Sequence, residues 1–336
     1  MPDKTNNTNN TRIAVIGGGA WGGALASTLA KRGHRVSILV RDDGLATALM
    51  QGRLPRLNNA VITPPAQATT DAESVLADAE IILRVVPVAA SAYALTAIKQ
   101  HAMESAIVGM AAKGLYSKAD GGDEALLQPE LAKRHITQSP VMLCGPSFAI
   151  EVVAGKLCCL VAAATDTKAA TSMASVFAGT PIRVYVSDDP IGVAVASSVK
   201  NVIAIAAGML DALELGSNAR AALITRGLAE ATRLALALGG RKETLFGLAG
   251  AGDLLLTATD KKSRNYAYGL ALAQGKPPAE LLAEGVHTAS RLLGRANKHG
   301  VELPIIAAVD RVVNQGSSIA DEIKALLARP VDYEWK

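Results

Sequence analysis

An apolar run near the N-terminus, Arg12–Ile16, leads directly into a loop with the spacing G-x-G-x-x-G, formed by Gly17, Gly19 and Gly22. This order predicts a short strand, a tight turn and then a helix over the Ala- and Leu-rich stretch Ala24–Arg32. Gly17 suits the turn, Gly19 lets a pyrophosphate approach the backbone, and Gly22 lets the helix pack closely on the strand. Free N–H groups at the start of such a helix attract phosphate. The pattern therefore predicts dinucleotide binding, with an ordinary tight turn between strand and helix as the alternative.

The second predicted strand, Arg35–Val40, ends beside residues that bear on the choice of cofactor. An acidic residue about 20 positions past the glycine fingerprint commonly binds the ribose 2′-hydroxyl of NAD. Arg41 stands at that tip, and Asp42 follows it. Arg41 favours admission of NADP, whose 2′-phosphate it could bind. In the alternative, Asp42 takes the hydroxyl of NAD, and Arg41 stacks beside the adenine or faces solvent. The expected cofactor is therefore NAD or NADP.

The first half of the chain alternates between strand-like and helix-like segments. Its further predicted strands are Glu80–Val86, Ala106–Ala111, Pro140–Leu143, Leu157–Ala163 and Ile182–Val186. Such alternation predicts a mostly parallel sheet with helices on both faces, whose ligand crevice lies at the carboxyl ends of the strands. A chain of 336 residues is long enough for a second domain with its own core.

From about Pro190 the pattern changes to helical periodicity without strand alternation. The helical segments are Ala194–Leu213, Asn218–Leu238, Ser290–His299 and Ile305–Asn314. We therefore expect an α/β fold class, with a disordered tail over 1–10, a dinucleotide-binding domain over 11–189 and an all-α domain over 190–336. The turn signal of Asp188, Asp189 and Pro190 marks the boundary.

Composition argues against several classes of function. The net charge is +4 and the basic residues are dispersed, so nucleic acid is not an expected partner. No apolar run reaches the roughly 18 residues of a membrane-spanning helix, and the polar N-terminus has no apolar secretory segment. The cysteines, Cys144, Cys158 and Cys159, lack disulfide-like or zinc-like spacing. We expect no metal and a cytoplasmic location.

Lys200 lies within the apolar helical stretch Val193–Gly208, which is too hydrophobic for a surface helix. Burial of a lone lysine lowers its pKa and fits it for proton transfer near neutral pH. In the alternative, its aliphatic stem runs along the helix and its amine reaches water. The residue pattern leaves both interpretations open.

A second set of polar residues surrounds Asp253. Glycines flank this carboxylate in the run Gly250–Asp253, which indicates that the backbone passes close to a ligand. The next helical stretch opens with Ser263, Arg264 and Asn265, which we call the anion site. A capping serine, a bidentate arginine and helix N–H groups suit a phosphate. The alternative is an ordinary capped helix with its arginine in solvent.

Two further residues follow predicted strands at the carboxyl edge of the sheet. Lys113 could hold a phosphate or a carbonyl oxygen as a point charge. Ser147 follows Gly145 and Pro146, without the G-x-S-x-G pattern of a serine nucleophile. Both residues could instead lie in loops that face solvent.

Taken in order, these motifs resemble the bacterial-type NAD(P)-dependent glycerol-3-phosphate dehydrogenases over nearly the whole chain. The matching segments are Gly17–Gly22, Ala112–Leu115, Cys144–Ala149, Val184–Tyr185, Asp188–Asp189, Val199–Gly208, Asn218–Glu230, Gly247–Leu254, Ser263–Asn265 and Glu284–Gly285. The resemblance implies a Rossmann-type sheet domain followed by a helical domain. It also implies a phosphorylated small-molecule substrate, with dihydroxyacetone phosphate and NAD(P)H converted reversibly to sn-glycerol 3-phosphate for phospholipid synthesis. The Ala-rich apolar helices favour a homodimer.

Position by position, the resemblance implies roles for individual residues. Lys200 matches the family's proton-transferring lysine and would be catalytic. The positions that match substrate contacts are Lys113, Gly145, Ser147, Lys200, Asp253, Ser263, Arg264 and Asn265. The positions that match cofactor contacts are Gly17, Gly19, Ala20, Trp21, Gly22, Arg41, Lys113, Ala149, Arg264, Leu282 and Glu284.

The chain departs from the family pattern without losing Lys200, Asp253 or Arg264. Ala20 stands where the family often has serine, which removes one phosphate hydrogen bond of about 1 kcal/mol, and Ala251 stands where leucine is common. We therefore expect an active enzyme. A β-hydroxyacid or ketopantoate-type reductase is one alternative, but it would not need the anion site. A catalytically idle nucleotide-binding protein is another, but it would not need Lys200.

Overall fold

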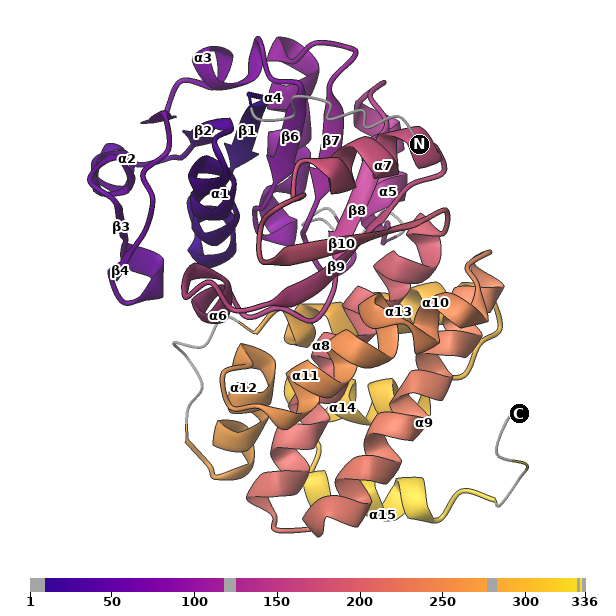
Figure 1. The fold of residues 1–336 in the computed structure, drawn as a ribbon. Coiled ribbons are helices and arrows are strands. Elements are labelled where there is room, and N and C mark those ends of the chain that lie inside the picture. The colour runs from indigo at the N-terminus through magenta and orange to yellow at the C-terminus, as the bar shows by residue number, and fades with distance from the viewer. Residues whose placement is uncertain (1–9, 118–124, 277–282, 331–332, 334–336) are drawn as a thin grey trace, which may run out of the picture. The chain divides into compact units, whose positions relative to one another are not determined.

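The computed structural model describes residues 10–117, 125–276, 283–330 and 333, and the chain divides into two compact units. The sheet unit comprises Met1–Ala112 and Gln128–Pro190, and the helical unit comprises Lys113–Leu127 and Ile191–Lys336. In Figure 1 the strands belong to the indigo-to-magenta part of the chain, and the orange and yellow part is helical. All but the last residue of the tail predicted over 1–10 lies outside the described residues.

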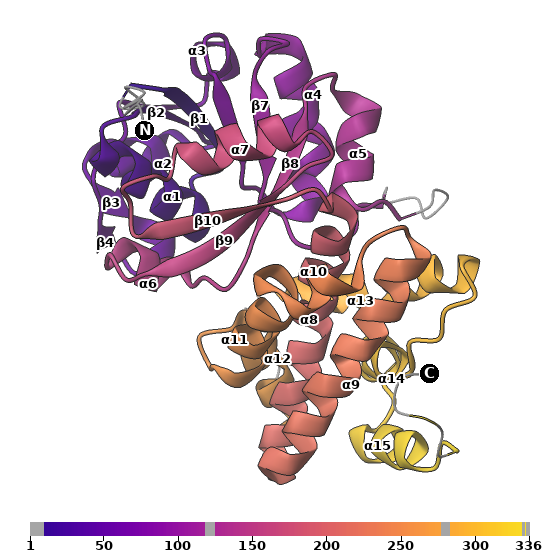
Figure 2. The ribbon, with the colours of Figure 1, turned by 45° about the vertical axis from the view of Figure 1, so that its right-hand side comes forward.

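An eight-stranded sheet runs through the sheet unit in the order β10-β9-β8-β7-β6-β1-β2-β5. These strands are β1 (Arg12–Ile16), β2 (Arg35–Leu39), β5 (Gln67–Thr69), β6 (Ile81–Arg84), β7 (Ile107–Met110), β8 (Pro140–Cys144), β9 (Cys158–Ala163) and β10 (Ile182–Ser187). All neighbours are parallel except β8 and β9, so the prediction of a mostly parallel sheet is confirmed (Figure 2). A separate antiparallel pair joins β3 (Arg53–Leu54) to β4 (Ala60–Val61), which the sequence patterns did not predict.

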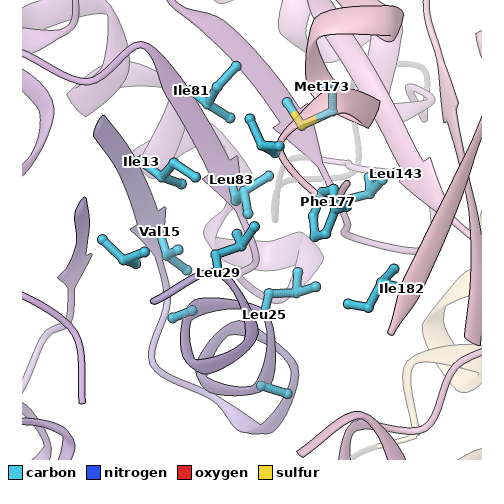
Figure 3. Close-up of a cluster of buried hydrophobic side chains, with 14 of the residues drawn as sticks. Ile13, Val15, Leu25, Leu29, Ile81, Leu83, Leu143, Met173, Phe177 and Ile182 are labelled. Carbon is cyan, nitrogen blue, oxygen red and sulfur yellow. The ribbon is translucent and has the colours of Figure 1, made fainter. Parts of the chain in front are cut away.

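The two faces of the sheet follow from alternation along the strands. Ile13 and Val15 of β1 and Ile81 and Leu83 of β6 belong to one buried apolar cluster (Figure 3). Side chains of α1 (Ala20–Arg32) and α7 (Thr167–Ser175) also belong to this cluster. Because successive strand residues point to opposite faces, Arg84 lies on the other face of β6. There it contacts the first residues of α4 (Ser91–His101) and α5 (Gln128–His135).

Helix α1 begins at Ala20, four residues before the predicted start at Ala24. The earlier start is possible because Gly22 sits against the preceding turn. A Cβ added to Gly22 would lie 1.9 Å from the carbonyl oxygen of Gly17. At the other end Gly33, with φ 103°, terminates the helix as predicted.

The helical unit is built around α8 (Pro190–Ala212). The other helices of this unit are α9 (Gly216–Ala237), α10 (Lys242–Phe246), α11 (Asp253–Thr259), α12 (Arg264–Ala273), α13 (Glu284–Lys298), α14 (Pro304–Gln315) and α15 (Ile319–Leu327). Helix α8 approaches α12 backbone to backbone, since a Cβ on Gly269 would lie 1.9 Å from the carbonyl oxygen of Ile205. By length and composition α8 could cross a membrane, but 94% of its apolar 18-residue window is buried within the protein, as in a core helix.

The segment Lys113–Leu127 belongs to the helical unit, although it lies within the residue range of the predicted dinucleotide-binding domain. The predicted domain 11–189 is continuous, whereas the chain leaves the sheet unit after Ala112 and returns at Gln128. Arg291 of α13 donates from Nη1 to the carbonyl oxygen of Leu115 at 2.9 Å, within the helical unit. No local periodicity marks this segment, because its membership depends on contacts 176 residues away in sequence.

Candidate active site

The glycine loop of the sheet unit leaves space where a phosphate would lie. Gly17 has φ +112°, and a Cβ there would lie 2.5 Å from the carbonyl oxygen of Val85, so only glycine fits the turn. A Cβ on Gly19, by contrast, would meet no heavy atom within 4 Å beyond its chain neighbours. Gly19 is also the N-cap of α1 and brings no side chain to that end of the helix. The loop therefore fits the pyrophosphate of a dinucleotide.

The residues that follow the loop offer backbone rather than side-chain polar groups. Ala20, Trp21 and Gly22 form the first turn of α1, and none carries a charge. Trp21 is half-buried and packs against the apolar cluster of the sheet unit. The N–H groups of this turn and the positive end of the helix dipole are thus what the chain presents to a phosphate.

Of the two residues at the end of β2, Asp42 forms a capping hydrogen bond and Arg41 is exposed. The Oδ1 atom of Asp42 accepts a hydrogen bond from the N–H of Leu45 at 2.7 Å, so this carboxylate caps α2 (Asp43–Met50). Arg41 is exposed at the end of β2. The capping contact occupies one oxygen of Asp42 and weakens the interpretation in which Asp42 binds the ribose.

At the end of β8, three predicted contact residues of the sheet unit follow one another. A Cβ on Gly145 would lie 2.6 Å from the carbonyl oxygen of Cys159, so the loop presses against β9 there. Ser147 donates from Oγ to the carbonyl oxygen of Gly145 at 3.1 Å. Ala149 begins α6 (Ala149–Val153), and this helix packs against α1.

In the helical unit, Asp253 brings two lysines together. Nζ of Lys200 lies 2.7 Å from Oδ1 of Asp253, and Nζ of Lys113 lies 3.1 Å from Oδ2. The side chain of Lys200 is 5% exposed and that of Asp253 is 1% exposed, whereas that of Lys113 is 20% exposed. The amine of Lys200 therefore does not reach water along its helix. We call these three side chains the lysine–aspartate cluster.

For Lys200 and for Asp253, burial and the opposite charge of the ion-pair partner shift the pKa in opposite directions. Desolvation lowers the pKa of Lys200 to about 8, although Asp253 raises it, and the like charge of Lys113 lowers it further. For Asp253, burial alone would raise the pKa, but the two lysines outweigh it and hold the pKa below its usual value. The cluster thus contains an ionised carboxylate and an amine that can exchange a proton near neutral pH.

Thr257 contacts two members of this cluster, although no role was predicted for it. Nζ of Lys200 donates to Oγ1 of Thr257 at 2.8 Å, and that hydroxyl donates to the carbonyl oxygen of Asp253 at 2.6 Å. Its spacing of four residues from Asp253 on a helix was the signal that could have found it.

The backbone before Asp253 explains its flanking glycines. A π-helical turn, Leu248–Gly252, precedes α11, and a Cβ on Gly250 would lie 2.0 Å from the carbonyl oxygen of Leu245. Such turns are rare and often occur at functional sites. At Gly250 the close backbone approach is to Leu245 of the same unit. That this backbone also passes close to a ligand stays a prediction.

In the anion site, the side chains of Ser263 and Asn265 bond to the backbone, whereas that of Arg264 is exposed. Ser263 is the N-cap of α12, and its Oγ accepts a hydrogen bond from the N–H of Tyr266 at 3.3 Å. Oδ1 of Asn265 accepts from the N–H of Gly285 at 3.0 Å, so both side chains shape the backbone. Arg264 is exposed. These contacts are those of a capped helix, and phosphate binding here stays a prediction.

Two predicted cofactor residues remain, and the structure describes one of them. Glu284 is the first residue of this helix. Leu282 lies outside the described residues. Among the predicted site residues, the structure joins Lys113, Lys200 and Asp253 by direct contacts and Ser147 to Gly145 by a hydrogen bond. It places Gly17 and Gly19 in the loop before α1 and Gly22 in the first turn of that helix.

Two family models together match nearly the whole chain. The model described as NAD-dependent glycerol-3-phosphate dehydrogenase N-terminus matches residues 12–170. The model of the C-terminus of the same enzyme matches residues 189–324. The second match includes Lys200, Asp253 and the anion site.

Individual proteins agree with the family models. A glycerol-3-phosphate dehydrogenase (NAD(P)+) of Mesorhizobium japonicum is 40% identical over 326 residues, which cover 96% of this chain and 94% of the relative. One of Methylobacterium radiotolerans is 41% identical over 330 residues, covering 96% and 98%. A glycerol-3-phosphate dehydrogenase crystal structure from Coxiella burnetii has a TM-score of 0.87 and 35% identity, covering 94% of this chain and 98% of that one.

Proposed function

The chain belongs to the NAD-dependent glycerol-3-phosphate dehydrogenase family, and from this premise we propose that it interconverts dihydroxyacetone phosphate and sn-glycerol 3-phosphate with NAD(P)H. It is then an oxidoreductase acting on a CH–OH group. The observation that carries the proposal is the buried contact between Lys200 and Asp253. Reduction of a carbonyl consumes one proton, and a general acid with a pKa close to the working pH delivers it most effectively.

The lysine–aspartate cluster divides the chemical work among its members. When bound, the cofactor supplies the hydride that reduces C2 of dihydroxyacetone phosphate, and it takes that hydride back in the reverse direction. Nζ of Lys200 donates a proton to the carbonyl oxygen during reduction and accepts the hydroxyl proton during oxidation. Asp253 and Thr257 hold the amine in one place. Lys113 adds a positive charge that stabilises negative charge developing on the oxygen.

For the substrate phosphate we propose the anion site. Arg264 is exposed at the start of α12, and a guanidinium binds phosphate in bidentate fashion. Ser263 and Asn265 support it by fixing the helix start and the backbone of Gly285. Gly145 and Ser147 of the sheet unit are proposed as further substrate contacts.

For the cofactor we propose that the backbone of Gly17, Gly19 and Gly22 faces the pyrophosphate. The open space at Gly19 and the uncapped start of α1 support this placement. Arg41 is proposed to accept the 2′-phosphate of NADP, because it is exposed at the end of β2 and one carboxylate oxygen of Asp42 is engaged in capping α2. The other proposed cofactor contacts are Ala20, Trp21, Lys113, Ala149, Arg264, Leu282 and Glu284.

We further propose a cellular location, an oligomeric state and a metabolic role. The three cysteines are free thiols, two of them half-buried, which fits a reducing compartment, so we propose a cytoplasmic location. The Ala-rich helices support a homodimer. The product, sn-glycerol 3-phosphate, is the backbone on which phospholipids are built, so we propose a role in their synthesis.

The direct test follows nicotinamide absorbance with purified protein, dihydroxyacetone phosphate, and NADH or NADPH in parallel. We expect consumption of reduced cofactor in both reactions. The Arg41→Ala variant should lose rate with NADPH while keeping its rate with NADH. No consumption with either cofactor, in protein that still binds them, would contradict the proposal and favour another reductase or an idle nucleotide-binding protein.

A further inference from the structure

Arg84 is a fully buried cation in the sheet unit, and among the described residues it forms no ion pair with a carboxylate. Its side chain is 0% exposed at the end of β6. Nη1 donates to Oγ of Ser91, and Nη2 donates to Oε1 of Gln128 at 2.7 Å. Nε has no hydrogen-bond acceptor among the described residues. All of its polar partners are therefore neutral.

The guanidinium keeps its charge in this environment. Burial lowers the pKa of Arg84 to about 10, and no acidic group in the described part of the chain offsets the effect. A group with that pKa is protonated at neutral pH. Its field is screened weakly, because protein rather than water surrounds it.

The position of Arg84 in the sheet places this charge at the edge where ligands bind. Arg84 is in register with Ile16 of β1, the residue before Gly17. The sheet order reverses between these two strands, since β1 leads to β2 and β5 while β6 leads to β7 and β8. Ligands of open α/β sheets bind at the carboxyl ends of the strands at such a reversal. The next residue, Val85, contributes the carbonyl oxygen that restricts Gly17.

We propose that Arg84 makes this site prefer the reduced nicotinamide cofactor over the oxidised one. The inference rests on the proposed function, since it requires a nicotinamide dinucleotide at the glycine loop. Both forms of the cofactor carry the same pyrophosphate, but the oxidised nicotinamide ring carries one more positive charge. An uncompensated cation attracts the pyrophosphate of both forms equally and repels only the oxidised ring. The site thereby favours the form that the reduction of dihydroxyacetone phosphate consumes.

A purely structural role for Arg84 leads to a different expectation. Its two donated bonds connect β6 to the starts of α4 and α5, so its loss could loosen the sheet unit. That loosening would change the affinities for both cofactor forms by the same factor. The ratio of the two dissociation constants, oxidised over reduced, therefore separates the electrostatic role from the structural one.

The test measures equilibrium binding of NADH and NAD+ to the Arg84→Met protein by titration calorimetry. Methionine keeps a linear apolar stem, and Oγ of Ser91 can still donate to Oε1 of Gln128, a contact of 3.2 Å in the structure. We expect the ratio of dissociation constants to fall by about threefold to tenfold. Arg84→Lys, which retains the charge, should keep the wild-type ratio.

Arg12→Met serves as the matched control. This arginine lies at the opposite end of β1, is 43% exposed, and pairs with Glu80 at 3.0 Å. Its removal should leave the ratio unchanged. If Arg84→Met does not fold, Arg84→Gln removes the charge while keeping polar atoms, and its ratio decides the matter.

The outcomes separate the two hypotheses. An unchanged ratio in a folded, uncharged variant overturns the role of Arg84 while leaving the proposed function intact. Failure of the wild-type protein to bind either cofactor form overturns the proposed function itself. A lowered ratio in both uncharged variants, restored by lysine, supports the inference.

Discussion

The sheet unit offers backbone to its proposed ligand, whereas the helical unit offers charged side chains. The loop and first helical turn over Gly17–Gly22 contain no charged residue, and they suit a phosphate because Gly19 has no side chain to fill the space beside it. The lysine–aspartate cluster instead consists of three ionisable side chains, and each lysine Nζ lies within 3.1 Å of a carboxylate oxygen of Asp253.

The difference shows that the two sites are vulnerable to opposite changes. An added methyl group damages a backbone site, because space is its essential property. A removed charge damages a side-chain site, because its members determine one another's protonation. Binding and chemistry should therefore be separable by mutation.

The largest effect is expected from Lys200→Met. Without the amine, the carbonyl oxygen has no general acid, and kcat for reduction should fall by about 10²- to 10⁴-fold. The dissociation constant for NADH should stay within about twofold of the wild-type value, as the glycine loop is untouched. Steady-state kinetics and calorimetry provide the two measurements. Lys324→Met, on the exposed face of α15, is the matched control and should be active. Wild-type turnover in Lys200→Met would remove the role assigned to the cluster.

A smaller effect, on stability and cofactor affinity rather than on kcat, is expected from two glycine variants. Gly22→Ala forces a methyl group against the backbone of Gly17 and should lower the free energy of unfolding by about 1–3 kcal/mol. Gly19→Ala places its methyl in open space and should lower that free energy by less than about 1 kcal/mol. It should nevertheless raise the dissociation constant for NADH about tenfold, or 1.4 kcal/mol, because the methyl excludes the phosphate.

Chemical denaturation and cofactor titration distinguish the two glycine variants. If Gly19→Ala binds NADH as tightly as the wild type, the phosphate does not lie at this loop. If Gly22→Ala is as stable as the wild type, the tight packing of α1 on the turn is not a constraint.

The smallest effect concerns pH. Reduction needs the protonated amine of Lys200, so kcat should decline as the pH rises through about 8. The oxidation of sn-glycerol 3-phosphate needs the neutral amine and should rise over the same range. Lys113→Met removes a like charge that lowers the pKa of Lys200, so both profiles should shift to higher pH, by about one pH unit. Profiles that stay in place would show that the two lysines do not interact during turnover.

The features predicted most accurately from the sequence are those that neighbouring residues determine. The strand, loop and helix around Gly17 are specified by neighbouring residues, and the structure differs only in where α1 begins. The long apolar segment around Lys200 was correctly assigned to the protein interior, because its composition is incompatible with a surface helix. The residue pattern alone could not assign its amine a partner, since Asp253 is 53 residues away, but the family resemblance placed this carboxylate near the lysine.

Three features depend on distant contacts and were missed for that reason. Arg84 reads as one charged residue in an apolar strand, and Gln128, which accepts its hydrogen bond, lies 44 residues further on. The contact between Lys113 and Asp253 spans 140 residues. The membership of Lys113–Leu127 in the helical unit follows from such contacts and from no local pattern.

The path of the chain has a consequence for how such a protein can be recombined. Because the segment that begins at Lys113 is encoded inside the sheet unit but folds with the helical unit, the two units are not consecutive modules of a gene. An exchange of residues 11–189 with a relative, made to import a new cofactor preference, would also import a foreign lysine segment beside Asp253. A split after Pro190 would leave the C-terminal piece without one of the two counter-ions of that carboxylate. Any exchange of the continuous segment that carries the glycine loop therefore also exchanges Lys113.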